Sequence, residues 1–438
     1  MTTQTATTHT TPSALMPMLI IGGLFFIFGF ITWLNGALIP FLQIVCDLTE
    51  TQALLVAFSF YIAYTVMALP MSWVLDKTGY KYAMVWGLVI IAVGCLLFIP
   101  AAYSHQFSLF LLAQFVVGSG LTILQTASNP YIVKVGPHET AAVRISIMGL
   151  LNKAAGVIAP VVFTALVLGD FAHVTAQSVA LMSEAERAIT VSSLADGLVS
   201  PYLGMAIALI VLAGLLKASA LPELEAEAEQ DTHADNTSIL SFPHLILGAI
   251  TLFMYVGVEV IAGDTIGLFG SQLGVANATT LTSYTMMFMV IGYLAGLVLI
   301  PRLINQAQAL LMSALLGIVL SILVVMSDPT SYAVSSILWG WMGIMTVPDT
   351  VAYIALLGLA NALVWPAIWP LALEGLGKFT SRGSALLIMG IAGGAILPLV
   401  YGVLAEAKTG QDAYWMLLPC YIFILFYAVK GHKIKQWR

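Results

Sequence analysis

Three ionisable side chains lie inside long apolar stretches of the chain, where a charged group is costly. They are Lys153, Glu259 and Asp264. An acid or base at the centre of a membrane-spanning helix costs about 2.5–3.5 kcal/mol on an insertion scale, so such groups usually serve a transport pathway or a charged partner. Glu259 lies about 17 residues into its stretch, near the middle. We predict that Glu259 binds a cation or exchanges a proton; a structural ion pair or hydrogen bond is the alternative.

Asp264 follows Glu259 by five residues, which places it about 140° further around a helix. One carboxylate can therefore face a cavity while the other faces a neighbouring helix or the outer mouth, and we keep Asp264 as a second cation-coupling candidate. Lys153 lies about ten residues from the cytoplasmic end of its stretch. We interpret it first as a structural side chain that reaches out to that boundary.

Uncharged amides also lie within the apolar stretches, in a set that suits a polyhydroxylated solute. An amide both donates and accepts hydrogen bonds, as sugar hydroxyls require. We expect Gln125 to bind substrate, although a hydrogen bond between helices is the alternative. Asn129, which precedes Pro130, is better explained by a carbonyl freed at a kink. The substrate-binding amide candidates are Asn35, Gln125, Asn152 and Asn361.

Aromatic rings can stack against the apolar face of a pyranose. Trp365 and Trp369 are spaced i, i+4 beside prolines, so they share one helix face and form the best stacking platform. Most aromatic residues of a membrane protein are packing or interface residues, so the other candidates carry less weight. These are Trp33, Tyr61, Tyr64, Tyr255 and Tyr284.

The composition sets the class of protein. Of 438 residues, 60% are hydrophobic and only 8% are charged, whereas soluble domains carry about 25% charged residues. This excludes a cytosolic enzyme, a disordered protein and a nucleic-acid binder. The three separated cysteines, Cys46, Cys95 and Cys420, indicate packing and not a disulfide framework. No metal-ligand cluster, nucleophile–base set or phosphate-binding loop is present, so we expect no enzyme activity and no cofactor.

Apolar runs of about 20 residues predict an all-α membrane protein with 12 transmembrane helices. We expect two pseudo-symmetric six-helix bundles, residues 1–220 and 242–438, joined by an acidic cytoplasmic linker over 221–241. The predicted spans are 16–42, 52–75, 82–101, 108–132, 144–168, 201–220, 242–270, 279–300, 307–326, 350–373, 383–405 and 413–430.

The basic residues predict the orientation. With both termini in the cytoplasm, twelve of the 15 basic side chains fall on the cytoplasmic side, as the positive-inside rule expects. They are Lys77, Lys81, Lys134, Arg144, Lys217, Arg302, Lys378, Arg382, Lys430, Lys433, Lys435 and Arg438. A thirteenth span over 332–347 would reverse the last loops, so we interpret that apolar segment as an external loop or interfacial helix.

Several motifs resemble those of a known family. The loop Asp76–Lys81 is similar to the loop signature of the major facilitator superfamily. The longer motifs are Leu34–Pro40, Leu124–Pro130, Gly257–Val260 and Ala385–Pro398. Together they resemble the fucose/glucose/galactose permease family of that superfamily, and most of all its glucose/galactose and N-acetylglucosamine permeases. The resemblance implies a cation-coupled sugar symporter that works by alternating access.

Departures from the fucose–proton symporters bear on the coupling ion. Those proteins carry acids at the positions of Gly36 and Gln125, and neither residue can titrate here. The resemblance to the glucose/galactose branch implies sodium, with Glu259 as a possible sodium ligand. Tyr293 stands where relatives often have Arg, and Asn152 matches an Asn that binds sugar in fucose permeases.

We therefore expect a monomer in the bacterial inner membrane that imports a hexose, such as glucose, galactose or N-acetylglucosamine. Sodium is preferred over a proton as the co-transported ion, and the bilayer and the sugar are the only expected partners. A proton-coupled sugar symporter is the alternative. A multidrug efflux carrier is a weaker one, because the set of mid-depth amides argues against an apolar cavity.

Overall fold

The structure is a computed structural model that describes residues 15–134, 141–169, 174, 176–223, 239–300, 302–376 and 379–437. Every regular element among these residues is a helix, so the predicted all-α class is confirmed. Most of the acidic linker, residues 224–238, lies outside the described residues, as do Lys378 and Arg438.

The described residues of the first part of the chain form nine α-helices. They are α1 (Leu15–Trp33), α2 (Asn35–Val45), α3 (Glu50–Val66), α4 (Ala68–Ser104), α5 (Phe107–Lys134), α6 (Ala141–Phe163), α7 (Ala176–Ala180), α8 (Glu184–Gly197) and α9 (Val199–Ala218). A π-helical turn, η2 (Thr164–Leu168), continues α6.

Eleven more are formed by the second part, as far as the structure describes it. They are α10 (Pro243–Val260), α11 (Ile266–Gln272), α12 (Leu281–Leu299), α13 (Gln306–Met326), α14 (Ala333–Leu338), α15 (Asp349–Asn361), α16 (Val364–Leu373), α17 (Thr380–Met389), α18 (Gly393–Ala407), α19 (Gly410–Ala413) and α20 (Leu417–Val429). The short elements η5 (Ile261–Thr265), η6 (Ala278–Thr280), η7 (Gly340–Met342) and η9 (Gly390–Ala392) lie between them.

Eleven of the described helical segments are long and apolar enough to cross a membrane. The predicted span 52–75 is not among them, because α3 is only 17 residues long and the rest of that span is merged into α4. Counting it gives the 12 spans expected from the sequence. Gly79 breaks α4 with a φ of +77°, a left-handed conformation that glycine adopts without strain, and this is the sharp turn of the Asp76–Lys81 loop.

Two spans are interrupted at the depth of polar candidates. The first span breaks between α1 and α2, next to Asn35, and Pro40 follows within α2. The tenth span breaks between α15 and α16, directly after Asn361, and Pro366 lies in the first turn of α16. Pro366, in a first turn, costs no hydrogen bond, whereas Pro40, inside α2, cannot donate one to the preceding turn.

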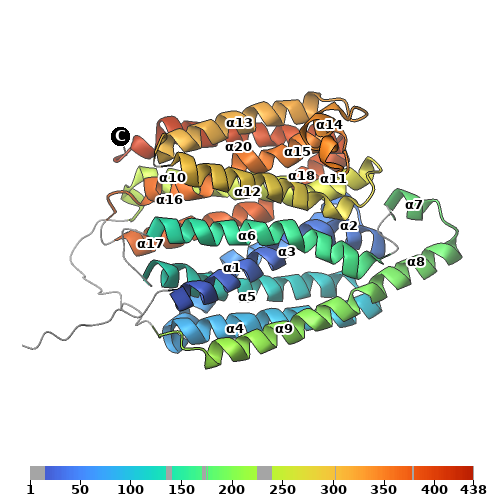
Figure 1. The fold of residues 1–438 in the computed structure, drawn as a ribbon, viewed down its shortest axis with the longest axis horizontal. Coiled ribbons are helices and arrows are strands. Elements are labelled where there is room, and N and C mark those ends of the chain that lie inside the picture. The colour runs from blue at the N-terminus through green and yellow to red at the C-terminus, as the bar shows by residue number, and fades with distance from the viewer. Residues whose placement is uncertain are drawn as a thin grey trace, which may run out of the picture.

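The helices lie side by side in one long bundle (Figure 1). We call the end where α9 stops, α10 starts and the C-terminus lies the linker end. The opposite end, which carries α7, α8 and α14, is the far end (Figure 1). Helices α6 and α12 pack together in the middle of the bundle and join the first part of the chain to the second (Figure 1).

The segment 332–347 forms two short helices, α14 and η7, and does not cross the bundle. The Ser335 hydroxyl donates to the carbonyl of Val347 at 2.7 Å, and the Trp339 indole donates to the carbonyl of Met345 at 3.0 Å. These bonds fold the segment back on itself, so the predicted loop or short helix is confirmed. The side of the membrane on which it lies stays a prediction.

Candidate functional site

The first feature of the site is a buried ion pair between the two parts of the chain. The ammonium of Lys153 on α6 lies 2.6 Å from the carboxylate of Glu259 on α10. The two residues are only 8% and 6% exposed. The expectation that Lys153 reaches out to the cytoplasmic boundary is wrong, because the ammonium finds a counter-charge inside the bundle and need not reach water.

Aromatic side chains surround this pair. The ammonium of Lys153 lies 4.4 Å from the centroid of the Trp33 ring, a cation–π distance. Trp33 is held close by a small residue, since a Cβ at Gly156 would lie 2.6 Å from its ring. The hydroxyl of Tyr255, one turn before Glu259 on α10, forms a hydrogen bond with the Glu259 carboxylate.

Asp264 shows the opposite arrangement. Its exposed fraction is 0%, and neither carboxyl oxygen has a hydrogen-bond partner among the described residues. A carboxyl group in such a place is most stable in its neutral, protonated form, because an isolated buried charge is very costly. Asp264 is therefore a group that can hold a proton without any other group gaining or losing a partner.

A π-helical turn positions Asp264. The segment η5 widens the helix, and the hydroxyls of Thr282 and Thr285 on α12 donate to the carbonyls of Gly263 and Ala262 at 2.6 and 3.0 Å. Single π-helical turns occur often at functional sites. Five residues across this turn do not advance the 140° expected for an α-helix, and both acids are buried, so neither faces an outer mouth.

Tyr61 approaches Asp264 from the first part of the chain. Its ring packs on α18, where a Cβ at Gly394 would lie 3.2 Å from it, and its hydroxyl has no hydrogen-bond partner among the described residues. The ring also stacks on Tyr64, with centroids 6.4 Å apart. The Tyr64 hydroxyl accepts a hydrogen bond from Gln125 at 2.9 Å. Gln125 is thus linked through Tyr64 to Tyr61, which interacts with the acids only electrostatically.

Asn35 is fixed by an amide that the sequence analysis missed. The side chain of Gln114 on α5 donates to the Asn35 carbonyl at 2.8 Å, and both residues are buried. The Asn35 amide nitrogen keeps no partner among the described residues, and α2 packs against η5, which carries Asp264. The signal for Gln114 was available, since it is an amide inside the predicted span 108–132.

The remaining predicted residues lie around this centre. Asn361 accepts a hydrogen bond from the Tyr421 hydroxyl at 2.8 Å, and its amide nitrogen has no partner among the described residues. Trp365 lies 6.3 Å from Tyr255 and 5.6 Å from Trp369 between ring centroids. Trp369 is thus one step further from the acids than Trp365.

Asn152 is less central than expected. It is half-buried, and its amide makes only a long hydrogen bond, 3.5 Å, to the carbonyl of Phe25 on α1. At this contact α1 and α6 touch closely, because a Cβ at Gly29 would lie 1.9 Å from the Asn152 carbonyl oxygen. Tyr284 lies elsewhere: it packs on Trp339, with ring centroids 5.6 Å apart, and donates to the carbonyl of Met345.

We refer to the residues gathered around the two acids as the central polar cluster. Its members come from α1, α2, α3, α6, α10 and η5, and therefore from both parts of the chain. They are Trp33, Asn35, Tyr61, Lys153, Glu259 and Asp264.

A second set of contacts between the two parts lies at the far end. Gln272 donates to the carboxylate of Glu50, the backbone N–H of Thr51 donates to Glu406 at 2.9 Å, and the hydroxyls of Thr164 and Thr279 lie 2.7 Å apart. We call these three contacts the far-end seam. They close the bundle on that side of the central polar cluster.

Comparison with known proteins assigns this architecture to a family. The model of the Major Facilitator Superfamily matches residues 21–400. The chain belongs to the major facilitator superfamily.

Within this superfamily, the relatives place the chain in the fucose/glucose/galactose permease family. It is 36% identical to a glucose/galactose transporter of Brucella abortus, over 94% of this chain and 92% of that protein. It is 26% identical to the L-fucose-proton symporter of Escherichia coli, over 95% and 93% of the two chains. A crystal structure of FucP in the outward conformation aligns with a TM-score of 0.70 and 25% identity, over 95% of this chain and 99% of the other. The chain is thus a multi-pass sugar transporter and not an enzyme.

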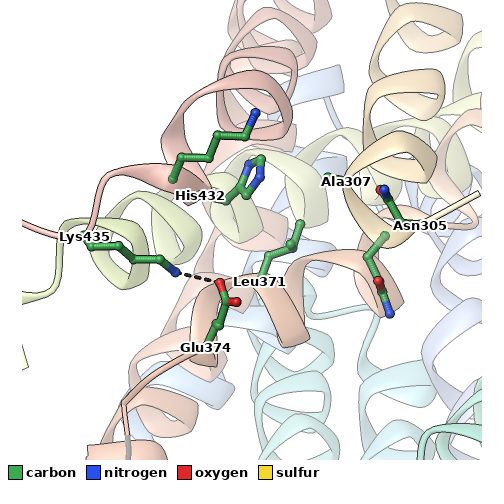
Figure 2. Close-up of a pocket in the computed structure, with 8 residues that line it drawn as sticks. Asn305, Ala307, Leu371, Glu374, His432 and Lys435 are labelled. Carbon is green, nitrogen blue, oxygen red and sulfur yellow. Dashed lines mark hydrogen bonds and ion pairs between the residues drawn. The ribbon is translucent and has the colours of Figure 1, made fainter.

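A pocket also lies away from the predicted site residues. It has a volume of about 480 Å³, lies at the linker end and includes Asn305, Leu371 and His432 (Figure 2). At its edge, Lys435 contacts Glu374 at 2.7 Å, and this hydrogen bond and charge hold the pKa of the exposed Glu374 carboxyl below its usual value. The contact supports the folded state at neutral pH and loses that contribution as the pH falls. None of the predicted site residues lines this pocket.

Proposed function

We propose that this sugar transporter is a cation-coupled hexose symporter that imports glucose, galactose or N-acetylglucosamine by alternating access. In this proposal residues 1–220 and 242–438 are the two moving halves, and the linker over 221–241 joins them. The chain works as a monomer in a bacterial inner membrane with both termini in the cytoplasm. The distribution of basic residues supports that orientation.

The observation that carries the proposal is the central polar cluster between the two halves. Several of its polar atoms lack partners among the described residues, namely the indole nitrogen of Trp33, the amide nitrogen of Asn35 and the hydroxyl of Tyr61. A buried polar atom without a partner costs about 1–3 kcal/mol. A hexose bound there would supply hydroxyls that donate and accept, with Gln125, Asn152 and Asn361 as further partners and Trp365 and Trp369 as stacking surface.

The coupling ion that these contacts favour is the proton. The carboxylate of Glu259, the predicted sodium ligand, is occupied by the Lys153 ammonium. A relative named as an L-fucose-proton symporter supports the same choice. The structure gives sodium coupling no comparable support.

Alternating access requires that one side opens as the other closes. The far-end seam is closed here, so release of a bound sugar would proceed toward the linker end. By linkage, the sugar and the proton must each raise the affinity for the other by the same factor. Placing both ligands in one cluster between the halves supplies that coupling directly.

The experiment that tests the proposal is uptake of radiolabelled sugars into proteoliposomes, with sodium and pH gradients imposed separately. We expect accumulation of at least one of glucose, galactose and N-acetylglucosamine when the outside is acidic, and none with a sodium gradient alone. Failure of every hexose under both gradients would overturn the proposal. Accumulation of lipophilic cations in place of sugars would instead establish the efflux carrier.

A further inference from the structure

We propose that Asp264 is the group that takes up and releases the co-transported proton, while Glu259 and Lys153 stay ion-paired and only position the cluster. This inference rests on the proposed function and divides the roles of the two acids.

The two acids lie in contrasting surroundings although only five residues separate them. Glu259 contacts an ammonium at 2.6 Å and the hydroxyl of Tyr255. Asp264 has no hydrogen-bond partner for either oxygen among the described residues and is fully buried. The first acid is compensated as a carboxylate, whereas the second is compensated only when it carries a proton.

Charge balance makes this division of roles necessary. A proton added to Glu259 would leave the Lys153 ammonium buried without a counter-charge, which is strongly unfavourable. A proton added to Asp264 removes a negative charge that nothing nearby compensates. With Asp264 ionised the three groups Lys153, Glu259 and Asp264 carry a net charge of −1, and with Asp264 protonated they carry none. The ion pair stays intact in both states.

The charged and titratable groups around Asp264 support the assignment. Glu259 interacts with it electrostatically from α10, and Tyr61 does so from α3. Helices α2 and α11, which pack against η5, contain no ionisable side chain. The other packed helices contribute groups with partners of their own, Asp349 to Ser331 and Glu406 to Thr51. Further tyrosines on those helices are Tyr284, Tyr293, Tyr353 and Tyr401.

Proton transfer at Asp264 makes and breaks a single O–H bond. On the proton-rich side, the Asp264 carboxylate takes one proton from water, forms one O–H bond and becomes neutral. On the other side the O–H bond breaks, water takes the proton and the carboxylate is restored. The electron pair stays on oxygen in both directions, and no other reactant is needed.

The test uses Asp264→Asn in the full chain, reconstituted in proteoliposomes. A one-proton symporter accumulates sugar up to about tenfold per unit of pH gradient. In Asp264→Asn we expect the accumulation ratio to fall to about one, because no proton moves. Counterflow of labelled sugar, which needs no net proton movement, should persist. The exposed Asp196 on α8 provides the matched control, and Asp196→Asn should accumulate sugar as the wild type does.

A second measurement distinguishes the role of Asp264 from that of Glu259, even if one variant folds poorly. Addition of sugar to purified protein in weak buffer should cause proton uptake in the wild type and none in Asp264→Asn. The double variant Lys153→Met/Glu259→Gln, which removes the pair without leaving a lone charge, should keep this uptake. It should also accumulate at least about tenfold more sugar than Lys153→Met alone.

The outcomes distinguish this inference from the proposed function. If Asp264→Asn still accumulates sugar on a pH gradient, or if the double variant loses proton uptake while Asp264→Asn keeps it, the assignment to Asp264 is wrong. Sodium-driven accumulation by the wild type that does not respond to pH also overturns it, although hexose transport then stands. Absence of all hexose transport by the wild type would instead overturn the proposed function.

Discussion

The central polar cluster and the far-end seam both join the first six spans to the last six, but they do so with different chemistry. In the cluster, an ammonium and two carboxyl groups lie in the dry interior, and one carboxyl has no partner among the described residues. The seam consists of hydrogen bonds between amides, hydroxyls, carboxylates and one backbone N–H; the Thr51–Glu406 bond is exposed, the Gln272–Glu50 bond half-buried and the Thr164–Thr279 bond buried. No seam bond carries a buried charge without a partner when it opens, so water can replace these bonds at low cost, whereas water cannot replace the ion pair of the cluster without exposing it.

This difference indicates which of the two regions changes its contacts during the transport cycle. A typical hydrogen bond contributes only about 0.5–1.5 kcal/mol net, so three of them can break and re-form in each transport cycle. A buried charge that loses its partner costs about 3–5 kcal/mol, which is too much to give up in every cycle. We infer that the seam opens and closes, while the ion pair is kept and the solutes complete the cluster.

The largest expected effect comes from breaking the ion pair. Lys153→Met leaves the Glu259 carboxylate buried without a partner, at a cost of about 3–5 kcal/mol. Sugar uptake in proteoliposomes should fall by about a hundredfold or more, and thermal unfolding in detergent should shift to lower temperature. Lys217→Met on α9, where the side chain is exposed, is the control and should leave both unchanged. If Lys153→Met and Lys217→Met lowered uptake and unfolding temperature by the same small amount, loss of the buried charge would matter no more than loss of an exposed one.

A smaller effect is expected from the helix contact that supports the cluster. A Cβ at Gly29 would lie 1.9 Å from the Asn152 carbonyl oxygen, whereas no atom of the described residues lies within 4 Å of one at Gly23 on the same helix. Overpacking of this kind costs about 1–3 kcal/mol. Gly29→Ala should therefore lower the unfolding temperature and the uptake rate, and Gly23→Ala should change neither. If the two variants unfold at the same temperature, α1 and α6 can separate freely.

Hydropathy and charge were sufficient to predict the helices and their order. Long apolar runs have no alternative to crossing a membrane as helices, and the loop with Gly79 had to turn sharply. The segment 332–347 was also predicted correctly, because its length and the distribution of basic residues argued against a span. These are properties of each stretch by itself, so one sequence reveals them.

The pairing of residues within the site could not be predicted in this way. Lys153 and Glu259 are 106 residues apart, and no spacing in the sequence states that α6 and α10 meet there. The π-helical turn at η5 depends on hydroxyls from α12, so the direction of Asp264 is set by another helix. Gln114 was missed for the same reason, since only the packing of α5 against α2 gives this amide its role.

An intermediate effect is expected for a single amide of the proposed sugar site. Asn361→Leu removes an amide whose nitrogen has no partner among the described residues. Losing one hydrogen bond to a sugar hydroxyl, worth about 1–1.5 kcal/mol, should raise the KM for hexose by about five- to tenfold. Gln411 is a matched amide at the far end that donates to the carbonyls of Val324, Val325 and Ser327. Gln411→Leu should lower stability but leave KM unchanged; the reverse result would place the sugar elsewhere.

The smallest effect is expected at the far-end seam. Glu406→Ala removes the acceptor of the Thr51 N–H, and one such exposed hydrogen bond is worth at most about 1 kcal/mol, or about fivefold in an equilibrium. The far end should then be open about two- to fivefold more often. A cysteine at Thr279, in a chain with Cys46→Ser, reports this opening as faster labelling by an impermeant maleimide.

The control for this measurement is Glu186→Ala on α8. Glu186 is also an acid at the far end, but among the described residues its carboxylate bonds only Ser183 of the same helix cap, so labelling should not change. A Glu406→Ala effect as large as that of Lys153→Met would mean that the seam, and not the cluster, holds the halves together. A two- to fivefold faster labelling, with sugar uptake unchanged, would instead support a seam of weak bonds. Only weak bonds can be opened once in every transport cycle by the binding of a sugar and a proton.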